Sequence, residues 1–199
     1  MHAPLRHVSD TALWVAMYRA FESERPDALF RDPFARRLAG ERGEAIVEAL
    51  PRGRSLAWPM VVRTAVMDEI ITRCVDRGVR TVINLAAGLD ARAYRMALPP
   101  ALRWLDVDLP DMIAYRREHL GDAKPVCACE SVAADLSDPA ATEAVLAREV
   151  EFQSVWEESL RLGRSVPLAR LWNFLGRFRS KAVREAYRRM SAIVLLERA

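Results

Sequence analysis

The chain has 199 residues, of which 51% are hydrophobic and 29% charged, with 8 glycines and 11 prolines. This composition excludes a disordered or collagen-like chain, and the length favours a single domain over 1–199. No apolar run approaches the ~20 residues that span a bilayer, and the first residues lack the apolar core of a signal peptide. We therefore expect a cytoplasmic protein with no membrane partner.

Cysteine and histidine are too few and too scattered to predict a disulfide framework or a closed metal site. The cysteines are Cys74, Cys127 and Cys129, and His2 and His7 lie close to the N-terminus. A closed zinc site needs four ligands. We expect buried or half-buried free thiols and no metal.

The net charge of +3 comes from the C-terminal part of the chain. Residues 161–189 hold nine basic side chains against one acid, Glu185. Such a stretch can bind an anionic partner, but apolar residues interleave with it at helical spacing. We therefore favour a solvated helical face and expect no nucleic-acid partner.

Residues 1–78 are predicted to be helical. Ser9 or Asp10 can cap a first helix with an apolar face, and Pro26 and Pro33 mark a bend before a new helix start. Further helices are predicted over about 41–50 and 59–77, the last ending at Gly78.

From residue 79 onwards, strands alternate with helices. Strands are predicted at 79–86, 103–108 and near 127–134, and helices at 91–98, 111–120 and 139–148. This alternation is typical of a parallel sheet with helices on its faces. It stops after Arg148, where strands are expected at 149–156 and 192–197, with helical stripes between them.

Acidic residues and a glycine stand where the first three predicted strands end. Gly88 follows the first strand, Asp108 ends the second, and Asp135 with Leu136 follows the third. Ligands of open parallel sheets bind at these carboxyl ends, and a carboxylate there can accept hydrogen bonds from ribose hydroxyls. The pattern indicates a nucleoside site, although these acids can also cap helices or turns.

The loop after the first strand favours S-adenosylmethionine over a dinucleotide. A dinucleotide site favours G-x-G-x-x-G, whereas this loop has Ala86 and Asp90, and Asp90 would stand beside two phosphates. S-adenosylmethionine carries no phosphate. Its carboxylate needs cations, which Arg19 and Arg63 on the N-terminal helices can supply.

Residues 84–95 closely resemble the Gly-Ala-Gly-Leu-Asp-Thr-Arg-Ala-Tyr-Arg signature of the leucine carboxyl methyltransferase-like family. These are class I S-adenosylmethionine-dependent O-methyltransferases. Further matches lie at 19–22, 30–35, 63–68, 106–110 and 134–136. The resemblance implies a Rossmann-like α/β fold with a helical cap at 1–78, cofactor-binding βαβ units at 79–148, and C-terminal strands and basic helices at 149–199.

The resemblance also assigns cofactor contacts. It implies that Arg19 and Arg63 contact the cofactor carboxylate and that Ala87 and Gly88 form the loop against the cofactor. It further implies that Asp108 binds the ribose and that Asp135 and Leu136 contact the adenine.

The chain departs from the family pattern at two places. Ala86 replaces the usual first glycine, and nothing after Arg148 matches the fourth and fifth strands of the family, on the order of 60 residues at ~30 per strand–helix unit. Because those strands sit beside the first one, we expect its edge to be exposed. The sheet then closes differently, a homo-oligomer covers the edge, or the chain is a damaged copy.

The resemblance implies methyl transfer to a carboxylate or hydroxyl of a small-molecule acceptor, with polyketide-like molecules among the options. A carboxylate needs no base, and we assign no catalytic residue because His119 is expected to face solvent. Trp14, Met17, Trp58 and Met60 on the N-terminal helices can cover the acceptor, although for any one of them we favour ordinary core packing. An impaired remnant that acts by binding and, more remotely, an NAD(P)-dependent oxidoreductase remain alternatives.

Overall fold

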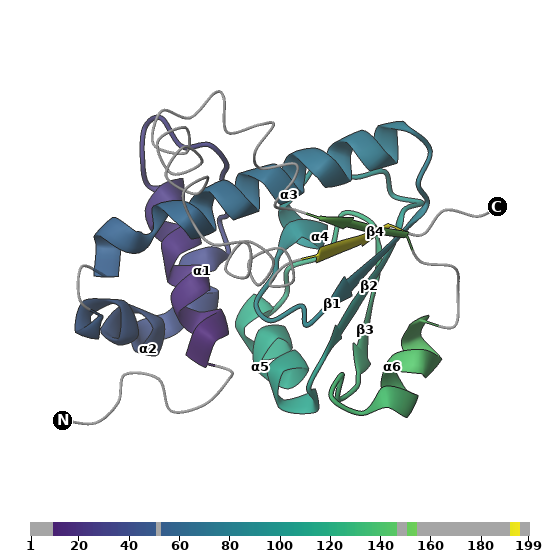
Figure 1. The fold of residues 1–199 in the computed structure, drawn as a ribbon. Helices are drawn as coiled ribbons and strands as arrows, with labels where there is room; N and C mark the ends of the chain where they lie inside the picture. The colour runs from purple at the N-terminus through teal and green to yellow at the C-terminus, as the bar shows by residue number, and fades with distance from the viewer. Residues whose placement is uncertain (1–9, 51–52, 147–150, 155–191, 196–199) are drawn as a thin grey trace, which may run out of the picture.

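The computed structural model of the protein describes residues 10–50, 53–146, 151–154 and 192–195. Within them, three α-helices and a short 3₁₀ helix precede the first strand of a five-stranded sheet (Figure 1). The basic stretch 161–189 and the helical stripes predicted between the last two strands lie outside the described residues.

The N-terminal part is helical, as predicted. Helix α1 (Asp10–Ser23) buries most of its predicted apolar face, and helix α2 (Ala35–Ala49) begins two residues after Pro33. Gly40, with a φ of 59°, bends α2 where the sequence predicted a separate helix to begin. A 3₁₀ helix, η1 (Gly53–Leu56), follows, and the Tyr18 hydroxyl on α1 donates to the Gly53 carbonyl at 2.7 Å.

Helix α3 (Trp58–Asp76) ends just before Gly78, close to the predicted end. Gly78 has a φ of +97°, and the amides of Gly78 and Val79 donate to the carbonyls of Val75 and Cys74 at 2.9 and 3.0 Å. This is a Schellman motif, which satisfies carbonyls that the last turn leaves unpaired. It turns the chain directly into the first strand.

Three parallel strands form the first part of the sheet. Strand β1 (Thr81–Leu85) pairs with β2 (Arg103–Asp108), which pairs with β3 (Ala128–Ala133). Helices α5 (Pro110–Leu120) and α6 (Pro139–Leu146) follow β2 and β3 close to their predicted positions. This α/β arrangement with N-terminal helices is consistent with a Rossmann-like methyltransferase fold, as the sequence predicted.

The helix after β1 is shorter than predicted. Helix α4 covers Arg92–Arg95 only, and Met96 is already extended with a ψ of 152°. Leu98 precedes Pro99, and a residue before proline disfavours the helical conformation. The predicted helix over 91–98 is therefore wrong beyond Arg95.

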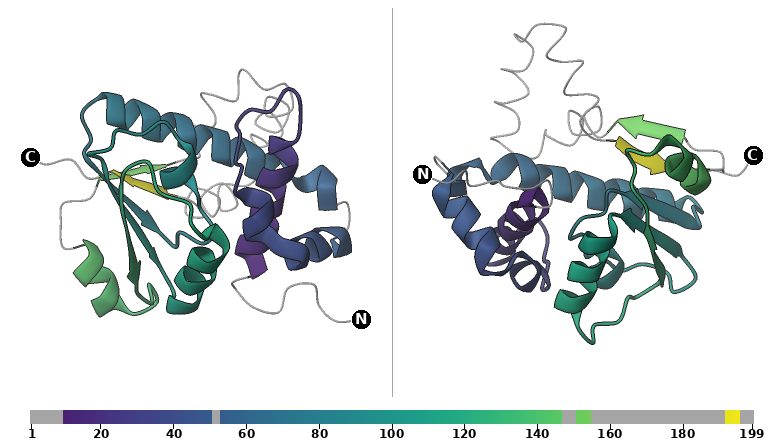
Figure 2. Two further views of the ribbon diagram at one scale, coloured as in Figure 1. Left: turned by 180° about the vertical axis from the view of Figure 1, so that it is seen from behind. Right: turned by 90° about the horizontal axis from the view of Figure 1, so that it is seen from below.

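Two more strands complete the sheet on the other side of β1. Strand β5 (Ala192–Leu195) runs antiparallel to β1, with Val82 opposite Leu195, and β4 (Glu151–Ser154) runs antiparallel to β5. The strand order is β3-β2-β1-β5-β4 (Figure 2). The β1 edge is thus paired with β5 at Val82, and of the three outcomes considered from the sequence the structure has the sheet closing differently.

The N-terminal helices meet the sheet through shared apolar cores. Helices α1 and α2 form one cluster that reaches Leu89 in the loop after β1 and Met112 on α5. A second cluster joins Ile71 on α3 to Val82 and Trp104 on the first two strands. Helix α3 runs from α1 and α2 across to the sheet (Figure 1). No helix in the described part of the chain is long and apolar enough to cross a membrane.

Candidate functional site

A cavity of about 990 Å³ lies at the carboxyl ends of the three parallel strands. The loops after β1, β2 and β3 form its floor, and α1 and α3 contribute the remaining walls. All seven residues predicted to bind a cofactor line it: Arg19, Arg63, Ala87, Gly88, Asp108, Asp135 and Leu136. The structure thus brings together residues that are up to 117 positions apart in the chain.

The loop after β1 has two residues in the left-handed region. Gly88 has a φ of +54°, and Ala86, with a φ of +52°, is the only non-glycine residue with positive φ in the described ranges. A Cβ at Gly88 would lie 3.3 Å from the Cβ of Ala12 on α1. Glycine therefore allows both the turn and the close approach of α1, whereas Ala86 adopts a conformation that disfavours a side chain.

Asp108 holds this loop against the end of β2. Its Oδ2 accepts a hydrogen bond from the Gly88 amide at 2.6 Å, and its Oδ1 accepts one from the Leu109 amide at 2.7 Å. A carboxylate oxygen can accept more than one hydrogen bond. Asp108 thus fixes the loop and retains acceptor capacity towards the cavity.

Asp135 is exposed and caps a turn. Its Oδ1 accepts from the amide and hydroxyl of Ser137 at 2.9 and 2.7 Å, and these hydrogen bonds lower the pKa of Asp135. The sequence raised the alternative that Asp135 caps a turn, and its Oδ1 does so. The other oxygen, Oδ2, makes no hydrogen bond among the described residues.

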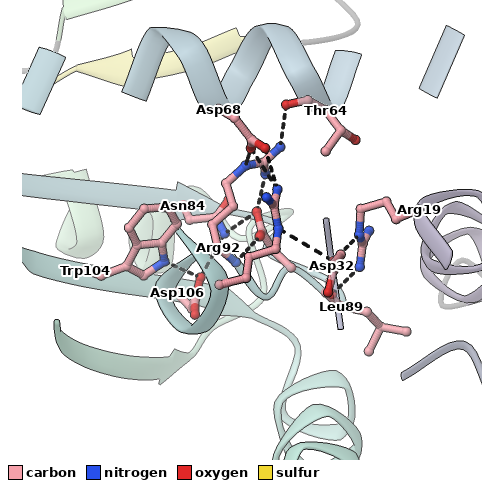
Figure 3. Close-up of polar contacts among 12 residues, drawn as sticks. Arg19, Asp32, Thr64, Asp68, Asn84, Leu89, Arg92, Trp104 and Asp106 are labelled. Atoms are coloured by element: carbon pink, nitrogen blue, oxygen red, sulfur yellow. Dashed lines mark hydrogen bonds and ion pairs between the residues drawn. The ribbon is translucent and has the colours of Figure 1, made fainter. Parts of the chain in front are cut away.

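Arg19 is buried and largely engaged within the protein. Its Nε donates to Asp32 Oδ2 at 2.9 Å, and its Nη2 donates to the Leu89 carbonyl at 2.6 Å. It therefore joins α1 to the segment before α2 and to the loop after β1 (Figure 3). Sequence reasoning treated Arg19 and Arg63 as equivalent, and the structure gives them different surroundings.

Arg63 has no ion-pair or hydrogen-bond partner within the described part of the chain, and its Nε is buried without one. Burial lowers the pKa of Arg63, and the neighbouring cations Arg92 and Arg19 lower it further, against the opposing effect of Asp90. Arg63 is half-buried, and shielding part of a guanidinium from water without a counter-charge is costly. An anionic ligand in the cavity would supply that counter-charge.

A chain of ion pairs lies beside these arginines, and sequence reasoning missed most of it. Asp68 on α3 pairs with Arg92 at 2.6 Å and with Arg95 at 2.8 Å, and Arg92 also pairs with Asp90. Arg95 reaches Asp32 at 3.7 Å. All these residues fall within the segments that resemble the family, which is the signal that could have identified them.

Asp90 is ionised and neutralised by this chain. Despite burial, which raises it, the pKa of Asp90 is lowered to about 2, chiefly by Arg92 and then by Arg19. The pKa of Arg92 is raised by Asp90 and Asp68 against the effect of burial. Asp90 is therefore not a bare charge that would repel phosphates, so the case against a dinucleotide rests on the missing glycines alone.

A second group of polar side chains is centred on the buried Asp106 and joins β1, β2 and α5. Asp106 on β2 accepts from the side chains of Asn84 and Trp104, each at 2.8 Å, and pairs with Arg116 at 2.9 Å. Burial raises the pKa of Asp106. The Cys129 thiol lies 3.7 Å from the same carboxylate, and burial followed by Asp106 raises its pKa to about 12.

The apolar wall of the cavity comes mainly from α1 and α3. Trp14 and Met60 line it, as expected for residues that cover an acceptor. Met17 is buried in the core instead, and neither it nor Trp58 is among the described lining residues. His119 stacks on Tyr115, with ring centroids 3.8 Å apart, and does not line the cavity.

The sequence of the chain matches a known family and several curated proteins. A family model described as leucine carboxyl methyltransferase matches residues 12–156. The chain is 41% identical over 138 residues to a Streptomyces coelicolor protein named "Putative S-adenosyl-L-methionine-dependent methyltransferase", covering 64% of this chain and 49% of that protein.

Two further relatives carry the same description. A Parafrankia sp. protein is 40% identical over 146 residues, covering 68% of this chain and 47% of its own length. A Rhodococcus jostii protein is 39% identical over 144 residues, covering 67% of this chain and 49% of its own length. The chain spans about half the length of the curated relatives it matches. Since the family model covers most of its residues, the chain belongs to the leucine carboxyl methyltransferase family.

Proposed function

We propose that the protein binds S-adenosyl-L-methionine and catalyses methyl transfer to an oxygen of a small-molecule acceptor. The observation that carries the proposal is Arg63, a half-buried arginine that has no partner among the described residues and lies in a cavity lined by every residue predicted to bind the cofactor. When bound, S-adenosyl-L-methionine supplies the methyl group. An acceptor oxygen forms a bond to the methyl carbon, the C–S bond breaks, and its electrons stay on sulfur.

Each lining residue has a proposed part in holding this cofactor. Arg63 offers its two terminal nitrogens to the carboxylate, and Arg19 offers Nη1, since its other nitrogens are engaged. The loop at Ala87 and Gly88 lies against the nucleoside, and Asp108 accepts from the ribose hydroxyls. Asp135 and Leu136 contact the adenine edge and face.

The cavity supports an acceptor that binds beside the cofactor. Its volume of about 990 Å³ lies at the upper end of the usual ~300–1,000 Å³ for small-molecule sites. Trp14, Met60, Met67 and Ile71 give this space an apolar wall. The acceptor oxygen belongs to a carboxylate, which needs no general base, or to a hydroxyl, which needs one.

We further propose that the chain is one methyltransferase-like domain that lacks the fourth and fifth strands of the family fold. In this arrangement, 1–78 cap the cofactor-binding units at 79–148, and 149–199 complete the sheet. The pairing of β5 with β1 supports this proposal, because the missing strands are expected beside β1.

A thermal melt with and without S-adenosylhomocysteine tests the cofactor proposal. Ligand at ~100 times its Kd adds about 2.7 kcal/mol to the native state, so the melting temperature rises. Arg63→Gln removes charge-assisted hydrogen bonds worth about 1.5–3 kcal/mol, so we expect a Kd roughly 10- to 150-fold higher. Arg77→Gln, at the exposed end of the same helix, is the matched control.

The outcomes separate the candidate functions. A cooperative melt that S-adenosylhomocysteine does not shift would refute cofactor binding and favour the binding remnant. Selective stabilisation by a nicotinamide dinucleotide would favour an oxidoreductase instead. If Arg63→Gln and Arg77→Gln bind equally well, Arg63 is not the carboxylate contact.

A further inference from the structure

Six charged side chains form one alternating chain beside the cavity (Figure 3). In order they are Arg19, Asp32, Arg95, Asp68, Arg92 and Asp90, joined by ion pairs of 2.9, 3.7, 2.8 and 2.6 Å and by the Arg92–Asp90 pair. We call this set the ion-pair chain.

The ion-pair chain connects α1, α3, α4 and the loop after β1, all of which contribute residues to the cavity lining. Arg19 belongs to α1, Asp68 to α3, and Arg92 and Arg95 to α4, while Asp90 lies in the loop after β1. No side chain in it is more than 16% exposed. Buried charges with several fixed partners have little freedom to move, so the ion-pair chain holds these elements in a set geometry.

The charges of this region do not cancel once Arg63 is included. The ion-pair chain contains three guanidinium groups and three carboxylates, and it is neutral in itself. Arg63 adds a fourth guanidinium, and among the described residues it has no carboxylate partner. Asp68 also fixes Arg92, whose Nη2 donates to the Thr64 carbonyl, next to Arg63, at 3.4 Å.

Building on the proposed function, we propose that Asp32 and Asp68 are positioning residues for recognition of the cofactor carboxylate. Asp32 fixes Arg19, and Asp68 fixes Arg92 and Arg95 against α3, so that Arg63 is left as the uncompensated guanidinium among the described arginines of the cavity lining. The site then selects nucleosides that carry an amino-acid carboxylate over those that lack it. Neither acid needs to touch the ligand.

Two ligands and two variants of Asp68 test this inference. S-adenosylhomocysteine carries the amino-acid group, and 5′-methylthioadenosine lacks it. Asp68→Asn keeps the reach of the side chain and removes its charge, whereas Asp68→Glu keeps the charge and changes the reach. Asp138→Asn is the control, since Asp138 caps α6 through the Ala140 amide and does not line the cavity.

We measure both Kd values by calorimetry and confirm cooperative melting of each variant. A positioning role predicts that both Asp68 variants weaken S-adenosylhomocysteine at least about tenfold and change 5′-methylthioadenosine less than about twofold. The Asp138 variant should change neither. Asp68→Glu keeps a good helix former on α3, so it provides the measurement if Asp68→Asn does not fold.

Three other results would overturn the inference. If Asp68→Asn tightens S-adenosylhomocysteine binding and Asp68→Glu leaves it unchanged, the negative charge of Asp68 only repels the ligand carboxylate, and Asp68 does not position the arginines. Equal losses for both ligands would mean a general structural role, and unchanged Kd values would mean no role. If the unmodified protein binds neither ligand, the proposed function itself fails, which is a separate and recognisable outcome.

Discussion

The left-handed conformation of Ala86 predicts that Ala86→Gly stabilises the protein. With a φ of +52°, the Cβ of Ala86 approaches its own backbone carbonyl, which costs about 1–2 kcal/mol. Glycine removes this cost but gives the unfolded chain more freedom, which returns about 0.4–1 kcal/mol. Because Ala86 is exposed, little packing is lost with its methyl group. The net gain expected is about 1 kcal/mol.

Urea unfolding of the ligand-free protein measures this gain. At constant m-value, a higher midpoint for Ala86→Gly reports the stabilisation directly. Ala97→Gly is the matched control, since Ala97 is exposed and lies outside any helix or strand without a positive φ. That control should lose about 0.4–1 kcal/mol. If both variants lose stability equally, Ala86 is not strained and the reasoning is refuted.

Three other measurements test the loop and its surroundings. Gly88→Ala should destabilise by about 1–2 kcal/mol and weaken S-adenosylhomocysteine, because the new Cβ meets Ala12 at 3.3 Å and φ is +54°; an unchanged urea midpoint would contradict this. Asp90 has its pKa depressed from 3.8 to about 2 in the folded state, so its contribution of about 2 kcal/mol is present above pH ~4 and is lost as pH falls towards 2. Asp90→Asn should therefore flatten the acid limb of a stability–pH curve, and an unaltered limb would show that Arg92 does not stabilise the carboxylate. The half-buried Cys129, with its pKa raised to about 12, should resist alkylation at pH 8 in the folded state, and rapid labelling would show that Asp106 does not suppress its thiolate.

The order of strands and helices could be predicted because local patterns specify it. The strand predicted at 103–108 lies between Pro100 and Pro110, and the structure has β2 at Arg103–Asp108. Gly78 marks the end of α3 because few other residues adopt its φ of +97° easily. Gly88, Asp108 and Asp135 come to one cavity because the carboxyl ends of parallel strands share an edge.

Side-chain partners could not be predicted, because they depend on contacts between distant segments. Arg19 bonds to Leu89, 70 positions away, and Asp68 pairs with Arg92, 24 positions away. Nothing in the local pattern distinguishes an arginine engaged in this way from Arg63, which stays unpaired. Similarly, β5 pairs with β1 through backbone N–H and C=O groups, which are common to nearly all residues. The sequence therefore does not specify which strand pairs with β1 on this side.

The bond from Arg19 to Leu89 also has a consequence for the speed of ligand exchange. Helix α1 can leave the loop after β1 only when this bond breaks. At about 1.5–3 kcal/mol, the bond alone limits the open state to roughly one molecule in ten to one in 150. A ligand that passes between α1 and this loop would associate more slowly by the same factor, and its release would wait for the same rare opening.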